Sequence, residues 1–152
     1  KALGGGMPLS ALLASEERLK TFRLSPPLGH ITSTGGHPLS CAAGKATIDT
    51  LKEEKLLEQV EEKGARMEEL LQHPAVHAIR RSGLMIGIDM DSRARANELV
   101  QKARKKGVLL FSFLSHPIGV RIAPPLNISM DDLEEAGKRI REALDELRSD
   151  RS

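Results

Sequence analysis

The chain has 152 residues, of which 39% are hydrophobic, 29% are charged and only 2% are aromatic, and its formal net charge is +2. This length suits one domain, or one domain with an extension, while the balanced charge and the scarcity of aromatic rings argue against a nucleic-acid-binding protein. No apolar run approaches the roughly 18 residues of a membrane span, and a single cysteine excludes an internal disulfide framework, so we expect a cytoplasmic protein without membrane partners.

By their pattern, the first 30 residues do not belong to the α+β layer that the later residues predict, and they indicate the edge of another unit. Residues 1–7 contain three consecutive glycines, which suit a tight turn. Residues 8–14 are a short apolar run that predicts a buried strand. A short helix is expected over residues 15–22 with Ser15 as its cap, and proline and glycine punctuate a loop over residues 23–36.

The remainder of the chain predicts an α+β layer. Pro38 suits the first turn of a helix, and the small residues that follow it allow a neighbouring element to approach closely. Helices are expected over 38–51, about 54–72, 92–106 and after Ser129, and strands over 76–79, 84–90, 108–113 and 120–123. The resulting order, α-β-β-α-β-β-α, is typical of a short sheet with helices packed on one face.

Three places in the sequence have residues that could carry chemistry. Lys1 precedes a flexible glycine run, and a lysine amine of lowered pKa adds to carbonyls, although a terminal lysine is more often a solvated charge. In residues 30–44, hydroxyls and glycines precede a helix start, which is typical of a phosphate site and also of an ordinary capped loop. Arg121 lies in an apolar strand, where it needs a carboxylate partner unless an edge strand exposes it to water.

Other polar residues fit structural roles. Cys41 is expected to be a small buried residue, although its place near a helix start could make its thiol somewhat acidic. The charged residues of 52–69 are typical of a solvated helix face with i,i+4 pairs. The histidines show no helix-face spacing for a metal, since His73 and His77 lie on either side of a proline, so we expect no metal site.

Four segments of the chain follow one another in the order KALGGGMPLSALLAS, GHITSTGGHPLSCAAG, RRSGLMIGIDMD and GVRIAPPLNIS. Together they resemble consecutive blocks of the class III (ornithine/acetylornithine/GABA-type) pyridoxal-phosphate-dependent aminotransferases. The resemblance extends to about residue 147 and concerns the C-terminal part of such enzymes. It implies the α/β architecture of PLP-dependent transferase fold type I, with residues 1–30 as a remnant of the large cofactor-binding domain and residues 31–152 as the C-terminal small domain.

The resemblance also implies roles for individual residues. Lys1 matches the lysine that forms a Schiff base with pyridoxal 5'-phosphate and later acts as a general base. Ser33 keeps the hydroxyl that reaches the cofactor phosphate, in the family usually from the neighbouring subunit of a homodimer, whereas Thr34 replaces an aromatic residue. Arg121 matches the arginine that binds the substrate α-carboxylate.

The implied activity is transfer of an amino group between an amino acid or ω-amine and an oxo acid. The family's ring-stacking, pyridine-binding and main phosphate-binding groups lie upstream of the lysine, so we expect this chain to be a C-terminal fragment that is inactive alone. Two alternatives stay open: a non-catalytic α+β module for dimerisation or regulation, and a racemase, aminomutase or decarboxylase of the same class.

Overall fold

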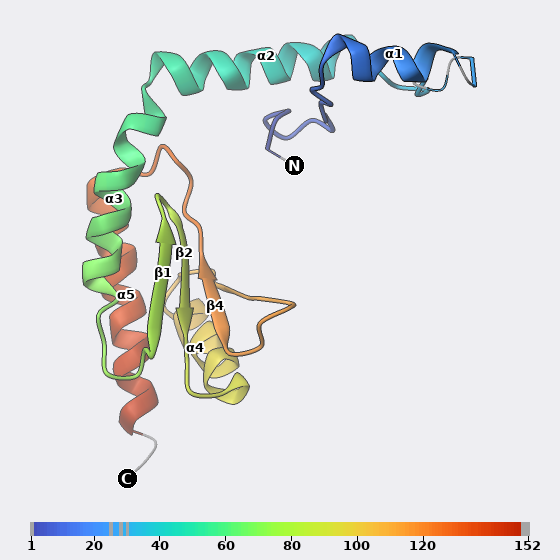
Figure 1. The fold of residues 1–152 in the computed structure, drawn as a ribbon. Helices are drawn as coiled ribbons and strands as arrows, with labels where there is room; N and C mark the ends of the chain where they lie inside the picture. The colour runs from blue at the N-terminus through green and yellow to red at the C-terminus, as the bar shows by residue number, and fades with distance from the viewer. Residues whose placement is uncertain (1, 25, 28, 30, 150–152) are drawn as a thin grey trace. The chain divides into compact units, whose positions relative to one another are not determined.

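The computed structural model describes residues 2–24, 26–27, 29 and 31–149, and Figure 1 shows its fold. The chain forms two compact units, residues 1–55 and residues 56–152, which are described separately below. The boundary expected near residue 30 concerns the division between domains of an intact enzyme, and it stays a prediction. None of the described helices has the length and the apolar character that crossing a bilayer requires.

The first unit contains two helices, α1 (Glu16–Leu24) and α2 (Pro38–Glu53). Both predicted starts are confirmed, because the Ser15 hydroxyl accepts a hydrogen bond from the Arg18 amide at 3.4 Å and Pro38 is the first residue of α2. The small residues of α2 allow the expected close approach: a Cβ added at Gly44 would lie 2.4 Å from Cδ2 of Leu9.

Two expectations for the first unit are wrong. Residues 8–14 form no strand, and Leu12 and Leu13 are 74% and 92% exposed. A strand needs a neighbouring backbone to satisfy its N–H and C=O groups, and no strand lies in the described part of this unit. Cys41 is a free thiol that is exposed rather than buried, because the face of α2 that carries it is not covered within this unit.

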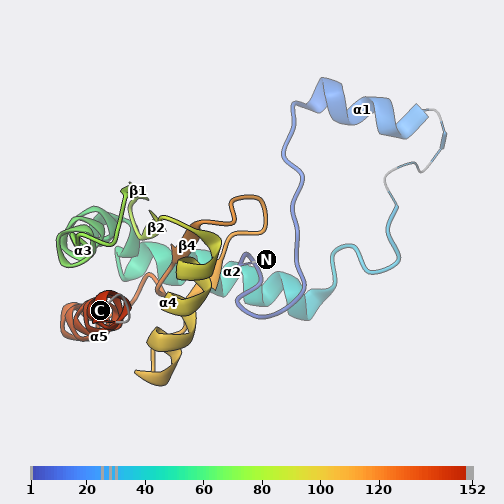
Figure 2. The same cartoon turned by 90° about the horizontal axis from the view of Figure 1, so that it is seen from below.

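The second unit confirms the predicted α+β layer. Its elements are α3 (Leu56–Leu70), β1 (Ala78–Ser82), β2 (Met85–Asp89), α4 (Arg93–Lys105), β3 (Phe111–Ser112), β4 (Gly119–Ile122) and α5 (Met130–Ser149). The strands form one antiparallel sheet in the order β1-β2-β4-β3. Helices α3, α4 and α5 lie on one face of this sheet, as Figures 1 and 2 show.

Alternation along the strands gives the sheet one buried and one open face. Ile86 and Ile88 of β2 pair with Ile122 and Val120 of β4, and all four are buried toward the helices. The same core contains the fully buried helix residues Met67, Leu71, Leu99, Leu133, Ile140 and Leu144. The intervening strand residues point away from the helices, so no helix of this unit covers them.

Local signals fix the ends of the helices. The Ser92 hydroxyl accepts from the Arg95 amide at 3.3 Å, and the Ser129 hydroxyl accepts from the Asp132 amide at 3.0 Å, so both predicted serine caps are confirmed. Helix α4 ends before Gly107, whose φ of 83° lies in the left-handed region that glycine tolerates.

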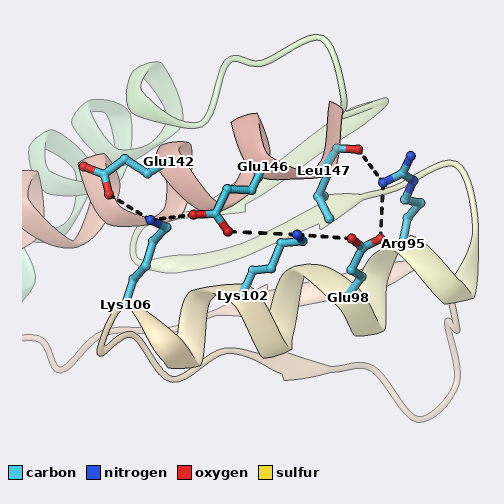
Figure 3. A network of polar contacts seen from close by, with 7 residues as sticks. All are labelled: Arg95, Glu98, Lys102, Lys106, Glu142, Glu146 and Leu147. Carbon is cyan, nitrogen blue, oxygen red and sulfur yellow. Dashed lines mark hydrogen bonds and ion pairs between the residues drawn. The ribbon is translucent and has the colours of Figure 1, made fainter. Parts of the chain in front are cut away.

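A network of polar contacts joins α4 to α5 (Figure 3). It comprises Arg95, Glu98, Lys102, Lys106, Glu142, Glu146 and the backbone of Leu147. Lys106 Nζ lies 3.2 Å from Glu142 and 2.8 Å from Glu146. The Arg95 guanidinium donates to the Leu147 carbonyl oxygen, which satisfies one of the free carbonyls near the end of α5. The network therefore fixes the C-terminal half of α5 against α4.

Candidate functional site

Arg121 projects from the open face of the sheet. Its strand, β4, is an inner strand between β2 and β3, and its side chain is exposed because that face has no covering helix. The guanidinium carbon lies 5.5 Å from the ring centroid of Phe111, its cross-strand partner on β3, within the range of a cation–π contact. No carboxylate among the described residues pairs with Arg121. Its side chain is exposed to water, as one of the two expectations has it, but it extends from an inner strand rather than from an edge strand.

A second aromatic ring lies over the β2 partner of Arg121. This cross-strand partner is Gly87. The ring of Phe113 covers this glycine, since a Cβ added at Gly87 would lie 3.2 Å from its Cε2 atom. The chain segment just before β4 therefore provides two rings, Phe111 against the Arg121 guanidinium and Phe113 over the residue paired with Arg121.

A nearly buried carboxylate, that of Asp89, lies on the same face of the sheet as Arg121. Asp89, at the end of β2, is only 8% exposed and receives hydrogen bonds from both terminal nitrogens of Arg80, one of them 2.7 Å long. His116 Nε2 lies 2.9 Å from the same carboxylate. The hydrogen bonds from Arg80, and to a lesser extent that from His116, hold the pKa of Asp89 below its ordinary value. Asp89 is therefore ionised at neutral pH and is paired with Arg80 and His116 in the structure.

This cluster is not among the sites predicted from the sequence, although a signal for it is present. Alternation places Asp89 and Gly87 on the face opposite Ile86 and Ile88, and a carboxylate on a largely buried strand requires a cationic or donor partner. Arg80 is the diagonal neighbour of Asp89 across the β1–β2 pair. His116 follows β3 by only four residues, but its position over the sheet depends on the path of the loop.

Ser33 and Thr34 occupy a turn directly before α2. The Gly35 amide donates to the Thr32 carbonyl at 3.4 Å, the His37 amide donates to the Thr34 carbonyl at 3.3 Å, and Gly36 has a φ of 71°. Both side chains are exposed, and neither hydroxyl bonds to a described residue.

A cavity of about 870 Å³ lies in the first unit, and Thr34 lines it whereas Ser33 does not. Apolar residues from α1 and its flanks form much of the remaining wall, among them Leu12, Phe22 and Ile31. Thr34 therefore forms part of the wall of a partly apolar cavity.

The predicted site residues are distributed over both units. Ser33 and Thr34 belong to the first unit and Arg121 to the second, while Lys1 lies outside the described residues. Within the described ranges, no group of three or more histidine, cysteine, aspartate or glutamate side chains is arranged to hold a metal ion.

Known proteins resemble this chain over nearly its whole length. The family model described as aminotransferase class-III matches residues 1–144. An acetylornithine aminotransferase from Caldanaerobacter subterraneus is 37% identical over 97% of this chain and 37% of its own length. An ornithine aminotransferase from Brevibacillus brevis is 38% identical over 95% of this chain and 35% of its own length. The chain thus spans about a third of the length of these curated relatives.

Solved structures have the same fold. An acetylornithine aminotransferase from Elizabethkingia anophelis superposes with a TM-score of 0.84 at 32% identity, over 96% of this chain and 39% of that one. An ornithine aminotransferase from Toxoplasma gondii, crystallised with partial occupancy of PLP at its active site, gives a TM-score of 0.77 at 28% identity, over 87% of this chain and 32% of that one. By both sequence and fold, this chain belongs to the class III aminotransferase family.

Proposed function

We propose that this chain forms the C-terminal part of an aminotransferase of the ornithine/acetylornithine type. The reaction would transfer an amino group between an amino acid or ω-amine and an oxo acid. The chain spans about a third of these relatives' length, which supports assigning the activity to a larger catalytic unit. The relatives named for ornithine and acetylornithine support this substrate class.

The state of Arg121 is the observation that carries the proposal. An arginine held on the open face of a sheet, with no carboxylate partner among the described residues, keeps its planar fork available for an incoming acid. Such a fork binds a carboxylate through two parallel hydrogen bonds. The Phe111 ring restricts the guanidinium without neutralising it. Arg121 is therefore the group that would bind and orient the substrate carboxylate.

The residues of the first unit fit a phosphorylated cofactor. Enzymes of this family are PLP-dependent. The exposed hydroxyls of Ser33 and Thr34 lie just before the N-terminus of α2, where backbone amides and the helix dipole favour an anion. These hydroxyls would contact the cofactor phosphate, and the Lys1 amine would hold its aldehyde end. When bound, the cofactor ring acts as an electron sink that makes the substrate Cα proton acidic.

The proposal assigns the proton transfer to Lys1. Its side-chain amine would take the Cα proton of the substrate as a general base and release it as a general acid, which together make up the 1,3-proton shift of amino transfer. Arg121 would keep the substrate oriented during this transfer. We also propose a cytoplasmic homodimer in which the Ser33 hydroxyl of one subunit reaches the cofactor of the other, as the family resemblance implies.

The proposal is tested by completing the catalytic unit. The N-terminal two thirds of the Caldanaerobacter acetylornithine aminotransferase would be joined to Lys1, and the product assayed with ornithine or N-acetylornithine, an oxo acid and PLP. We expect a visible absorbance band from lysine-bound PLP and steady amino transfer, both abolished by Lys1→Ala. A folded product that binds PLP but transfers no amino group, or that forms racemised, rearranged or decarboxylated products instead, would contradict the proposal.

A matched control separates the chemistry from folding. Lys20 is an exposed lysine on α1 whose ion pair with Glu16 is solvent-exposed. Lys20→Ala should leave both the absorbance band and the transfer rate unchanged. A non-catalytic module would show neither band nor turnover in any variant.

A further inference from the structure

The loop of residues 113–118 joins β3 to β4 and is tied to the sheet at both ends. The Phe113 amide donates to the Gly119 carbonyl at 3.2 Å, and the Gly119 amide donates to the His116 carbonyl at 2.9 Å. The Met90 amide, just beyond β2, donates to the Ile118 carbonyl at 3.0 Å. This 113–118 loop therefore has a defined path beside the open face.

Two glycines allow the loop's rings to contact the sheet backbone. A Cβ added at Gly119 would lie 2.6 Å from Cδ2 of His116 and 2.7 Å from Cδ2 of Phe113. A Cβ added at Gly87 would lie 3.2 Å from the Phe113 ring. Any larger residue at Gly119 would displace both rings, so the glycines define where the loop can lie.

Asp89 fixes His116 in this position. The carboxylate is nearly buried and accepts from Arg80 on β1, while His116 Nε2 lies 2.9 Å from it. Asp89 is thus held by the sheet on one side and holds the 113–118 loop on the other. Without His116, the loop would lose its side-chain anchor to β2.

We propose that Asp89, acting through His116, is a positioning residue for Arg121. The anchored loop keeps the Phe113 ring over Gly87, the β2 partner of Arg121, while the Phe111 ring lies against the guanidinium. We infer from this placement that the two rings limit the positions that the guanidinium can adopt on the open face. The guanidinium is thereby ordered before an acid arrives, which lowers the entropic cost of binding. That the ligand is a substrate carboxylate rests on the proposed function, whereas the ordering of Arg121 does not.

Fluorine NMR on the 152-residue chain tests the ordering without any enzymatic assay. The chain has only three phenylalanines, Phe22, Phe111 and Phe113. Labelling with 4-fluorophenylalanine therefore gives three resonances, which Phe→Leu variants assign. The Arg121→Met variant then shows how far the Phe111 resonance moves when the guanidinium is removed.

We expect His116→Ala and Asp89→Asn to move the Phe113 resonance, and to move the Phe111 resonance toward its position in Arg121→Met. His77→Ala is the matched control, because His77 is an exposed histidine that donates its amide to the Asp89 carbonyl without a side-chain contact to this cluster. An unchanged Phe111 resonance in both variants would overturn the proposal, and so would a Phe111 resonance that does not respond to Arg121→Met.

The completed enzyme provides the second measurement. Ornithine carries the carboxylate, and 1,4-diaminobutane is the same chain without it. We expect His116→Ala to raise KM for ornithine about tenfold, with kcat and the KM for the diamine changed by less than about twofold. An unchanged ornithine KM would overturn the positioning role. If the parent enzyme transfers no amino group from either donor, the proposed function fails, and the fluorine result alone decides the role of Asp89.

Discussion

Replacing Gly64 by alanine should push helix α3 away from the β1–β2 hairpin that carries Asp89. A Cβ at Gly64 would lie 2.2 Å from the carbonyl oxygen and 2.8 Å from the carbonyl carbon of Gly83, in the hairpin turn. Both atoms are backbone, so no rotamer change relieves the overlap. The helix must shift, and the fully buried Met67 and Leu71 must shift with it.

Two opposing terms decide the size of the effect. Alanine is favoured over glycine in a helix interior by about 1 kcal/mol. Overpacking a well-packed core costs about 1–3 kcal/mol, and a clash with backbone belongs at the upper end of that range. We therefore expect Gly64→Ala to lower the free energy of unfolding by about 2 kcal/mol, which lowers Tm by about 10 °C in a domain of this size.

Gly137 provides the matched comparison. It also lies within a helix, α5, but a Cβ there would meet side-chain rather than backbone atoms: Cδ1 of Leu70 at 2.5 Å, which can rotate away, and Cβ of Leu70 at 3.0 Å, which requires only a small shift. The gain in helix propensity is the same, so Gly137→Ala should stay within about 1 kcal/mol of the parent. Urea unfolding followed by circular dichroism measures all three proteins. A Gly64→Ala protein as stable as Gly137→Ala would refute this reasoning.

Three further results are expected. Because the pKa of Asp89 is depressed, its contribution to stability is complete above the ordinary carboxyl value of 3.8 and is lost as the pH falls through its folded-state pKa. Below about pH 4, the free energy of unfolding of Asp89→Asn should therefore fall less steeply with decreasing pH than that of the parent. The same dependence on pH in both proteins would contradict the pairing of Asp89 with Arg80. Arg95→Ala should lower the free energy of unfolding in urea by about 1–2 kcal/mol, because the Leu147 carbonyl loses its charged donor. It should also speed amide hydrogen exchange at the end of α5, and unchanged exchange there would contradict this expectation. Finally, the 152-residue chain mixed with PLP, an amino acid and an oxo acid should give no steady amino transfer, which product analysis over many equivalents of enzyme checks.

Features that depend on neighbouring residues could be predicted from the sequence. The starts of three helices follow from Pro38, Ser92 and Ser129, and each was located correctly because capping is decided within one turn. The buried face of the sheet follows from alternation along β2 and β4. The four family-like blocks also predicted the family that the comparisons show.

Features that depend on distant partners could not be predicted. The apolar run 8–14 has the composition of a strand, but composition does not reveal whether a neighbouring strand exists to pair with it. The exposure of Arg121 depends on the strand order, in which β4 pairs with β2 and β3, and on the lack of a helix over that face. The contact between Asp89 and His116 spans 27 residues and depends on a loop conformation that only the folded chain defines.

The role proposed for Arg121 is tested most directly by comparing donors in the completed enzyme. The measurement is kcat/KM for ornithine and for 1,4-diaminobutane, in the parent and in Arg121→Met. If Arg121 binds the substrate carboxylate, the variant loses about 100-fold or more with ornithine, because a bidentate charged contact is lost, and changes little with the diamine. Equal losses with both donors, or no loss with ornithine, would contradict it.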